Sequence, residues 1–265
     1  MEIGSWPSST LTSYIFGLYS CLVNLIFKHC TLWKTDRSPA CRAVMMALDC
    51  MNMSITEVDV NMDAGEHKAP EMIILNPLQT LPVFKDRELI LSDSHAICSY
   101  LVTRYCDFSN LLPKDPGGRS VVDQQLHYNS GVLYPRYRSA AYPILYENCH
   151  FVMPQQIIEI ECAYEDLENM LGGRRWFGGE QLNLSDIVFA STVSTLNVLV
   201  PVDKHKFPSL SAWLQKISEE VFFVTANRRG LSEFSRRIDT GKVSEDKQFK
   251  CPRSSMRRRY LARPE

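Results

Sequence analysis

Ser38-Pro39-Ala40-Cys41 connects two segments of this chain that have different sequence patterns. It follows a short apolar segment, Cys30-Thr31-Leu32-Trp33, and it opens a segment in which Val44, Ala47, Leu48 and Met51 share one helical face. Proline suits the first turn of a helix, because the missing N–H is not needed there and the ring pre-sets the backbone dihedral. The pattern predicts a strand that passes directly into a helix, with Ser38 at the junction.

The segments that follow complete a recognisable order of elements. An alternating segment from Ile55 to Val60 predicts a second strand, and Leu81–Phe84 with Glu88–Leu91 predicts a hairpin. A helix is expected from Ser92–Ser94 to about Arg104. Strand–helix–strand followed by strand–strand–helix is the order of a thioredoxin-like domain, which we assign to residues 30–107.

The second half of the chain differs in composition. Prolines and glycines mark residues 108–118 as a linker, and helical patterning without strands predicts an all-α domain over 119–235. Asn183 followed three residues later by Asp186 predicts a capped helix start. The predicted fold class is therefore an α/β thioredoxin-like N-terminal domain with an all-α C-terminal domain.

The two ends of the chain lie outside these two domains. We interpret residues 1–29 as an extension of uncertain status. The apolar run from Leu11 to Phe27 is at the lower limit for crossing a bilayer, and a membrane anchor is the alternative. We expect the basic stretch 236–265, which contains Arg257-Arg258-Arg259, to be a disordered tail, with nucleic-acid or lipid binding as the alternative.

Composition narrows the functional classes. The 265 residues carry a formal net charge of −1, which argues against a general nucleic-acid binder. Nine cysteines without a C-x-x-C pair or a Cys/His ligand spacing predict no disulfide framework and no metal site. A reducing, cytoplasmic location fits best.

Ser38 stands where a thioredoxin fold would carry the first cysteine of a redox pair, at the positive end of a helix dipole. A hydroxyl forms no disulfide there, but it can donate a hydrogen bond to a thiolate brought by a ligand. The alternative is that Ser38 only caps the helix.

Two further segments point to a peptide ligand. A cis proline at Leu81-Pro82 would turn the Leu81 backbone outward to pair with an extended peptide; a simple edge-strand proline is the alternative. Asp93-Ser94 opens a helix whose N–H groups favour a carboxylate, and the Asp93 carboxylate can hold an ammonium group. Helix capping alone is the alternative for these residues. Their combination with Ser38 indicates a site for a thiol-containing peptide.

The chain resembles insect cytosolic glutathione S-transferases of the epsilon class or the closely related delta class. The similarity covers about Thr31 to Phe234. It is carried by Ser38 to Val44, Gly65-Glu66-His67, Leu75-Asn76-Pro77, Leu81-Pro82, Asp93 to Ile97 and Leu133 to Arg138.

The resemblance implies a role for each residue of the glutathione site. Ser38 would be the catalytic serine that hydrogen-bonds the sulfur, and Leu81-Pro82 would pair with the cysteinyl unit. Asp93 and Ser94 would hold the γ-glutamyl end, while His67 and Gln79 would approach the glycine carboxylate.

Three residues depart from the family pattern. Gln79 stands where His is frequent, Asp93 replaces a Glu, and Ala40 replaces a second proline. The first two changes are each expected to weaken glutathione binding by up to about tenfold, or about 1.4 kcal/mol.

The second substrate is expected across the cleft, on one helical face of the all-α domain. Spacings of three and four place on that face Tyr134, Tyr137, Arg138, Ala141, Tyr142 and Leu145. An aromatic stripe is more often core than pocket, but the resemblance favours the pocket for Tyr134, Tyr137 and Arg138. Arg138 can add positive potential near the thiolate or form a salt bridge.

The function implied is a homodimeric transferase that conjugates glutathione to hydrophobic electrophiles in detoxification. Peroxide reduction and the elimination of halide from organochlorine insecticides are also known in the family. One alternative is a non-catalytic carrier of hydrophobic ligands with the same fold. Another is a thiol–disulfide enzyme that uses Cys41, although the helical position of that residue favours packing.

Overall fold

The computed structural model describes residues 27, 29–106 and 111–242. A four-stranded sheet has the order β2–β1–β3–β4, made of β1 (Cys30–Lys34), β2 (Thr56–Asp59), β3 (Val83–Asp86) and β4 (Leu89–Leu91). β1 is parallel to β2 and antiparallel to β3, which is antiparallel to β4. The predicted strands and hairpin are confirmed.

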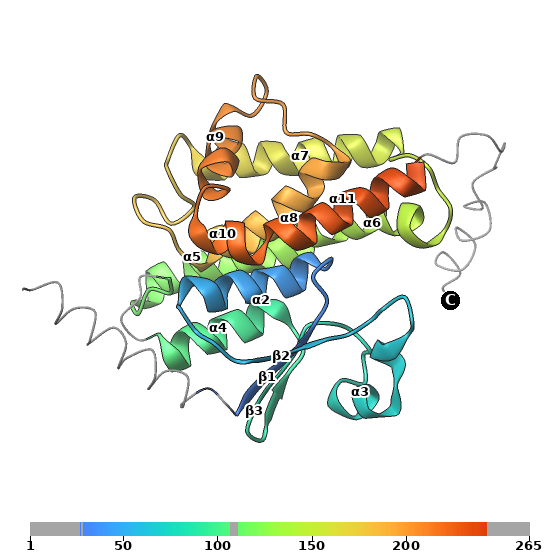
Figure 1. Cartoon of the computed structure of the whole chain (residues 1–265). Helices are drawn as coiled ribbons and strands as arrows, with labels where there is room; N and C mark the ends of the chain where they lie inside the picture. Colours follow the sequence, from blue (N-terminus) through green and yellow to red (C-terminus); the bar gives the residue numbers. More distant parts are fainter. Residues whose placement is uncertain (1–26, 28, 107–110, 243–265) are drawn as a thin grey trace, which may run out of the picture.

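Two helices separate this sheet from the rest of the molecule. They are α2 (Pro39–Cys50) and α4 (Ser94–Tyr105), whereas the turn η1 (Glu66–Lys68) and α3 (Pro70–Leu75) lie to the side of the sheet (Figure 1). Val44, Ala47 and Leu48 are buried, as their shared helical face predicts. The apolar face of α2 thus joins the sheet to the second domain.

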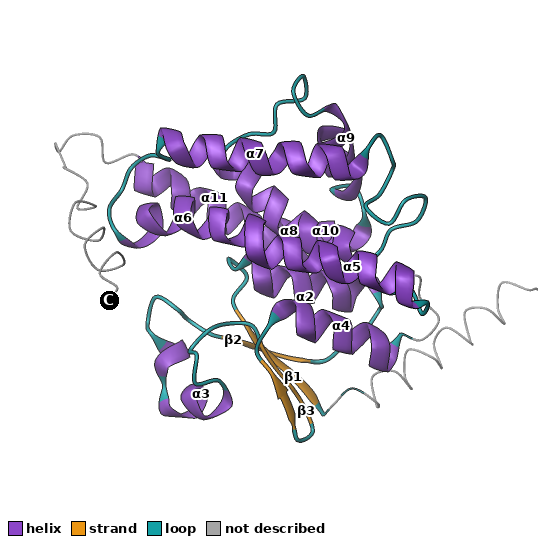
Figure 2. Ribbon diagram, turned by 180° about the vertical axis from the view of Figure 1, so that it is seen from behind, coloured by secondary structure: helices purple, strands orange, loops and turns teal. Residues whose placement is uncertain are grey.

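The second domain is helical, and its order is α5 (Pro116–Tyr128), the π-helical turn η2 (Asn129–Leu133), α6 (Tyr134–Tyr146), α7 (Pro154–Leu171), α8 (Leu184–Leu199), α9 (Pro208–Ile217), α10 (Val221–Ala226) and α11 (Arg228–Lys242). α2 packs on α8 and α10, so the two domains share one continuous core (Figures 1 and 2). The predicted fold class is confirmed.

Asn183 and Asp186 cap α8 as predicted. The Asn183 side chain accepts hydrogen bonds from the backbone N–H groups of Ser185 and Asp186, and the Asp186 carboxylate accepts one from the Asn183 N–H. Asp186 is fully buried and also accepts from Trp213 Nε1 at 2.9 Å. The cap therefore also ties the start of α8 to α9.

Two predicted boundaries are wrong. The linker assigned to 108–118 ends sooner, because Asp115 caps α5 by accepting from the Gly118 N–H at 2.7 Å and Pro116 fills its first turn. Residue 236, where the tail was predicted to begin, lies inside α11, which continues to Lys242. Phe234 and Ile238, four residues apart, bury one side of that helix, so the packed structure extends past the predicted end.

The apolar N-terminal run is described only at its last residue. Phe27 is buried and packs edge-on against Tyr105, with ring centroids 4.7 Å apart. The rest of the run, residues 11–26, lies outside the described residues, as do residues 243–265 of the predicted tail. No helix within the described ranges has both the length and the hydropathy needed to span a bilayer.

Candidate active site

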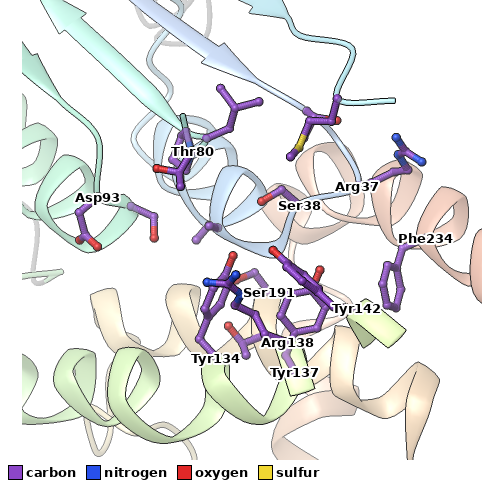
Figure 3. A pocket seen from close by; sticks show the side chains of 18 of the residues that line it. Arg37, Ser38, Thr80, Asp93, Tyr134, Tyr137, Arg138, Tyr142, Ser191 and Phe234 are labelled. Atoms are coloured by element: carbon purple, nitrogen blue, oxygen red, sulfur yellow. The ribbon is translucent and has the colours of Figure 1, made fainter. Parts of the chain in front are cut away.

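A cavity of about 430 Å³ opens between the two domains. Of the residues predicted from the sequence, those that line it are Ser38, His67, Gln79, Leu81, Pro82, Asp93, Ser94, Tyr134, Tyr137, Arg138, Tyr142 and Leu145. Figure 3 shows Ser38 and Asp93 on the side of the first domain, with Tyr134, Arg138 and Tyr142 on the other. Segments far apart in the sequence thus meet in one cleft.

Ser38 is the N-cap of α2, and its side chain faces the cavity. Its Oγ accepts a hydrogen bond from the Cys41 N–H at 3.4 Å. A hydroxyl carries two acceptor lone pairs and one proton, so capping leaves the proton available for donation. The two interpretations of Ser38 are therefore compatible, because the same oxygen can cap the helix and donate into the cleft.

Leu81 and Pro82 form the part of the wall that precedes β3. The peptide bond between them is cis, as predicted. Leu81 is only 8% exposed and Pro82 is buried, and both residues line the cavity.

Asp93 is the N-cap of α4. Its Oδ1 accepts from the backbone N–H groups of His95 at 2.9 Å and Ala96 at 3.0 Å. These bonds use only Oδ1, and the side chain is 65% exposed, so the carboxylate can also accept from an ammonium group. Ser94 is buried beside it, at the first position of the helix.

His67 and Gln79 line the cavity from the loop region around α3. Burial, and to a smaller extent the neighbouring Lys68, lower the pKa of His67, so its imidazole is neutral at neutral pH. Gln79 has a left-handed backbone, with φ of 56°, and its N–H donates to the Asn76 carbonyl at 2.9 Å. Both residues offer neutral hydrogen-bond donors rather than positive charge.

The opposite wall is the aromatic face of α6. The rings of Tyr134 and Tyr137 have centroids 5.4 Å apart, and the Arg138 guanidinium carbon lies 4.6 Å from the centroid of the Tyr142 ring. Among the described residues, no carboxylate lies within ion-pair distance of Arg138. Arg138 lines the cavity, so its positive charge lies at the cleft.

Ala141 is the one predicted residue that the structure does not bring to the cavity. It is completely buried, and it is not part of the lining. Successive residues of a helix point about 100° apart, so Tyr142 faces the cleft while Ala141 faces the packed interior. The spacing of three and four residues predicts a broad helical face. Only one side of that face borders the cavity.

Sequence patterns missed several lining residues. Arg37 precedes Ser38, and Phe234 and Arg237 come from α11. The Asp63 carboxylate pairs with both arginines, at 2.8 Å to Arg37 and 3.6 Å to Arg237, so the loop after β2 is tied to α11 at the cavity mouth. Arg37 could have been predicted as a lining residue because it is next to Ser38. No local sequence pattern indicated that α11 contributes to the cavity.

Cys41 is separated from the cavity chemistry. It is completely buried, it does not line the cavity, and its Sγ accepts from the Thr35 N–H at 3.5 Å. Burial raises the pKa of this thiol to about 11, which disfavours the thiolate that a nucleophile needs. The structure thus supports a packing role.

Comparison with known proteins agrees with this geometry. The family model "Glutathione S-transferase, N-terminal domain" matches residues 28–103, and "Glutathione S-transferase, C-terminal domain" matches residues 157–220. Glutathione S-transferase 1 of Manduca sexta is 36% identical over 202 residues, which are 76% of this chain and 93% of the relative.

Two solved structures are similar over the same region. One is an epsilon-class glutathione S-transferase from the housefly Musca domestica, at TM-score 0.77 and 31% identity over 80% of this chain and 98% of the other. The second is a glutathione transferase homologue from Drosophila mojavensis with bound glutathione, at TM-score 0.77 and 31% identity over 80% and 97%. The serine-capped helix, the cis-proline segment and the helical second wall thus occur in a chain that belongs to the glutathione S-transferase family.

Proposed function

We propose that this protein conjugates the thiolate of glutathione to hydrophobic electrophiles. The observation that carries the proposal is that the Ser38 hydroxyl, at the N-terminus of α2, faces a cavity whose far wall presents Arg138 and aromatic rings. The thiol proton leaves to solvent. The sulfur then forms a bond to an electrophilic carbon, and a leaving group departs with its electron pair or an activated double bond takes up a proton.

Stabilisation of the thiolate is the main chemical contribution of the protein. A hydrogen bond from Ser38 and the positive end of the α2 dipole both favour the anion. A thiol pKa lowered by about two units corresponds to about 2.7 kcal/mol. That shift ionises much of a thiol near neutral pH, which supplies the nucleophile without a separate base.

The rest of the first-domain wall supports binding of the tripeptide. The Leu81 backbone pairs with the cysteinyl unit, Asp93 and Ser94 hold the γ-glutamyl end, and His67 and Gln79 donate to the glycine carboxylate. Because the last two are neutral, we expect weaker electrostatic attraction at that end than a charged residue would give.

The α6 wall supports a hydrophobic second substrate. Tyr134, Tyr142 and Leu145 offer apolar surface, while Arg138 adds positive potential where negative charge develops on the electrophile. Tyr137 is only 5% exposed, so it supports the wall more than it contacts a ligand. We also propose that this site acts in detoxification, including insecticide resistance. The same site is proposed to have peroxidase or dehydrochlorinase side activity.

Ser38→Ala tests the proposal. In complexes with bound glutathione, the ultraviolet absorbance of the thiolate is titrated with pH, and kcat/KM is measured with an aryl halide. We expect the thiol pKa of bound glutathione to rise toward its value in water. We expect kcat/KM to fall about 10- to 150-fold, as for the loss of a hydrogen bond of about 1.5–3 kcal/mol to a charged group.

Two controls separate chemistry from helix capping. Ser38→Thr keeps a hydroxyl that can cap and donate. Asp115→Ala removes the N-cap of α5, a helix that does not line the cavity. Its loss should lower the free energy of unfolding by about 1 kcal/mol, comparable to the loss of the Ser38 cap. An unchanged thiol pKa in Ser38→Ala would contradict the mechanism. Retention on immobilised glutathione with no turnover of conjugation, peroxide or dehydrohalogenation substrates would favour the carrier function.

We also propose that the protein is a cytoplasmic homodimer. Ile74 on α3 and Leu78 after it are 80% and 74% exposed, an apolar surface that a second copy can cover. Sedimentation of wild type and Leu78→Asp tests this: the wild type is expected to run as a dimer, and the variant as a smaller species. Cell fractionation tests the location.

A further inference from the structure

A second group of reactive side chains lies at the other end of β1 from Ser38. His29 and Cys30 stand at the amino end of that strand, and Asp86 is the residue of β3 that pairs with Cys30. Tyr105, the last residue of α4, lies over them. None of these residues lines the glutathione cavity, so the proposed transferase chemistry does not use them.

Three metal-ligating atoms converge in this cluster. One imidazole nitrogen of His29, the Cys30 Sγ and a carboxylate oxygen of Asp86 all lie within 4.8 Å of one another. His29 Nε2 and Asp86 Oδ1 are 3.2 Å apart. Zinc–nitrogen and zinc–oxygen bonds of about 2.05 Å at a tetrahedral angle place the two ligand atoms about 3.4 Å apart. The observed distance therefore suits a shared ion.

The hydrogen bonds of Asp86 leave one oxygen for such an ion. Its Oδ2 accepts from the hydroxyls of Tyr100 at 2.6 Å and Tyr105 at 2.5 Å. Its Oδ1 is buried, in a residue only 6% exposed, and no described group donates a hydrogen bond to it. His29 Nε2 lies within ion-pair distance of Oδ1, and a metal ion held between the two atoms would take up a lone pair from each.

The tyrosines act as the outer shell that a metal site requires. Hydrogen bonds to the second oxygen of a ligating carboxylate fix its orientation and tune the metal. The Tyr105 hydroxyl is also 3.6 Å from Cys30 Sγ and 3.5 Å from His29 Nε2, so it borders the position of a fourth ligand. A water molecule at that position completes a tetrahedral set.

We propose that His29, Cys30 and Asp86 bind one Zn²⁺ ion at the amino end of β1. A thiolate, an imidazole and a carboxylate form a donor set of the kind that zinc selects, whereas magnesium and calcium prefer oxygen ligands alone. The thiolate and the carboxylate balance the charge of the ion, so the buried site is neutral overall. The ion joins β1 to β3 where the chain enters the first domain. No local cysteine–histidine spacing predicts this site, because β1–β3 pairing brings Asp86 to the other two.

The test uses the full-length, untagged protein, stripped with a chelator and kept reduced with a phosphine, in the absence of glutathione. Co²⁺ is titrated as a spectroscopic probe, and Zn²⁺ is then measured by displacement of the cobalt signal. Wild type is expected to bind one ion per chain, with visible bands of tetrahedral Co²⁺ and a near-ultraviolet thiolate-to-cobalt band. Zn²⁺ is expected to raise the Tm of the wild type.

Variants decide whether these residues are the ligands. Cys30→Ser is expected to abolish the thiolate-to-cobalt band, and His29→Ala to weaken binding by about tenfold or more. Cys162→Ser is the matched control, because Cys162 is an exposed thiol on α7. It should leave the spectrum, the stoichiometry and the zinc-dependent Tm unchanged.

His29 is half-buried and precedes β1, so His29→Ala keeps the test decisive if Cys30→Ser does not fold. Circular dichroism identifies variants that are folded. Absence of one-to-one binding in wild type, or a folded His29→Ala with wild-type affinity, would overturn the proposal. The cluster would then be a hydrogen-bonded network only.

Discussion

The Arg42 guanidinium donates to the side-chain oxygen of Asn227 at 2.6 Å, inside the interface between the two domains. Both residues are completely buried, and Arg42 also donates to Thr195 Oγ1 at 2.6 Å. Burial lowers the pKa of Arg42 to about 10, and at neutral pH it remains charged. A charged group of the first domain is thus held by neutral acceptors of the second, one turn of α2 behind Ser38.

Removing either acceptor is expected to destabilise the protein strongly. Asn227→Ala leaves a buried cationic donor without its partner, and we expect a loss of about 2–3 kcal/mol in the free energy of unfolding, measured by urea denaturation. Thr195→Val should cost a similar amount. The loss of unfolding free energy in the double variant should differ from the sum of the two single losses, because both residues bind the same guanidinium. Thr240→Val, at an exposed hydroxyl of α11, is the control and should change stability by less than about 0.5 kcal/mol.

Gly230 allows α11 to approach the loop that carries Ser38. A Cβ atom at this position would lie within 1.9 Å of the Asp36 carbonyl oxygen, so Gly230→Ala must displace backbone. We expect a loss of about 1–3 kcal/mol in unfolding free energy and a lower kcat/KM, since α11 also carries Phe234 and Arg237 of the cavity wall. In Gly131→Ala the added Cβ meets nothing within 4 Å. Wild-type activity in Gly230→Ala would show that this approach does not position the site.

Asp186 is expected to be among the most sensitive positions for stability. Its carboxylate accepts from the N–H groups of Phe177 at 2.8 Å and Asn183 at 2.9 Å, besides the Trp213 indole. Asp186→Ala leaves several buried donors unpaired and should cost about 3 kcal/mol or more in thermal or urea unfolding.

The control for Asp186 is Asp166→Ala. Asp166 is an exposed carboxylate that accepts one hydrogen bond, from the Tyr128 hydroxyl at 2.7 Å. Its loss should cost no more than about 1 kcal/mol, since water can replace it. Equal losses of unfolding free energy in the two variants would show that the burial of Asp186 does not explain its contribution to stability.

Glu168 gives a pH-dependent contribution to stability. Burial alone would raise its pKa, but hydrogen bonds from Ser209 and Leu210 at the start of α9 outweigh this effect, and the net pKa is lowered from the usual 4.5. A pKa that is lower in the folded state means that the ionised carboxylate favours folding above pH 4.5. That contribution is lost as the pH falls through the lowered value.

Urea unfolding of wild type and Glu168→Gln from pH 7 to pH 3 checks this sign. The stability difference between the two should be largest at neutral pH and should shrink below pH 4.5. Glu165→Gln, at an exposed neighbouring position of α7, should show a small difference throughout. A Glu168→Gln difference that grows with acidity would contradict the assignment.

Features that depend on neighbouring residues could be predicted from local sequence patterns. Pro39 after Ser38, the cis bond at Leu81-Pro82, and Asn183 with Asp186 are signals within a few positions, because caps and turns form hydrogen bonds over one helical turn. Such signals predicted the order of the elements and placed Ser38 at the head of α2. They also indicated which segments line the cleft.

The faces that meet in the folded protein could not be predicted from local sequence patterns. Ala141 turns into the interior beside Tyr142, α11 continues past the predicted end, and Asp86 is brought beside His29 and Cys30. These relationships depend on strand pairing and helix packing between segments distant in the chain. A local pattern specifies that a face is apolar, but the packing partner decides how much of that face remains open.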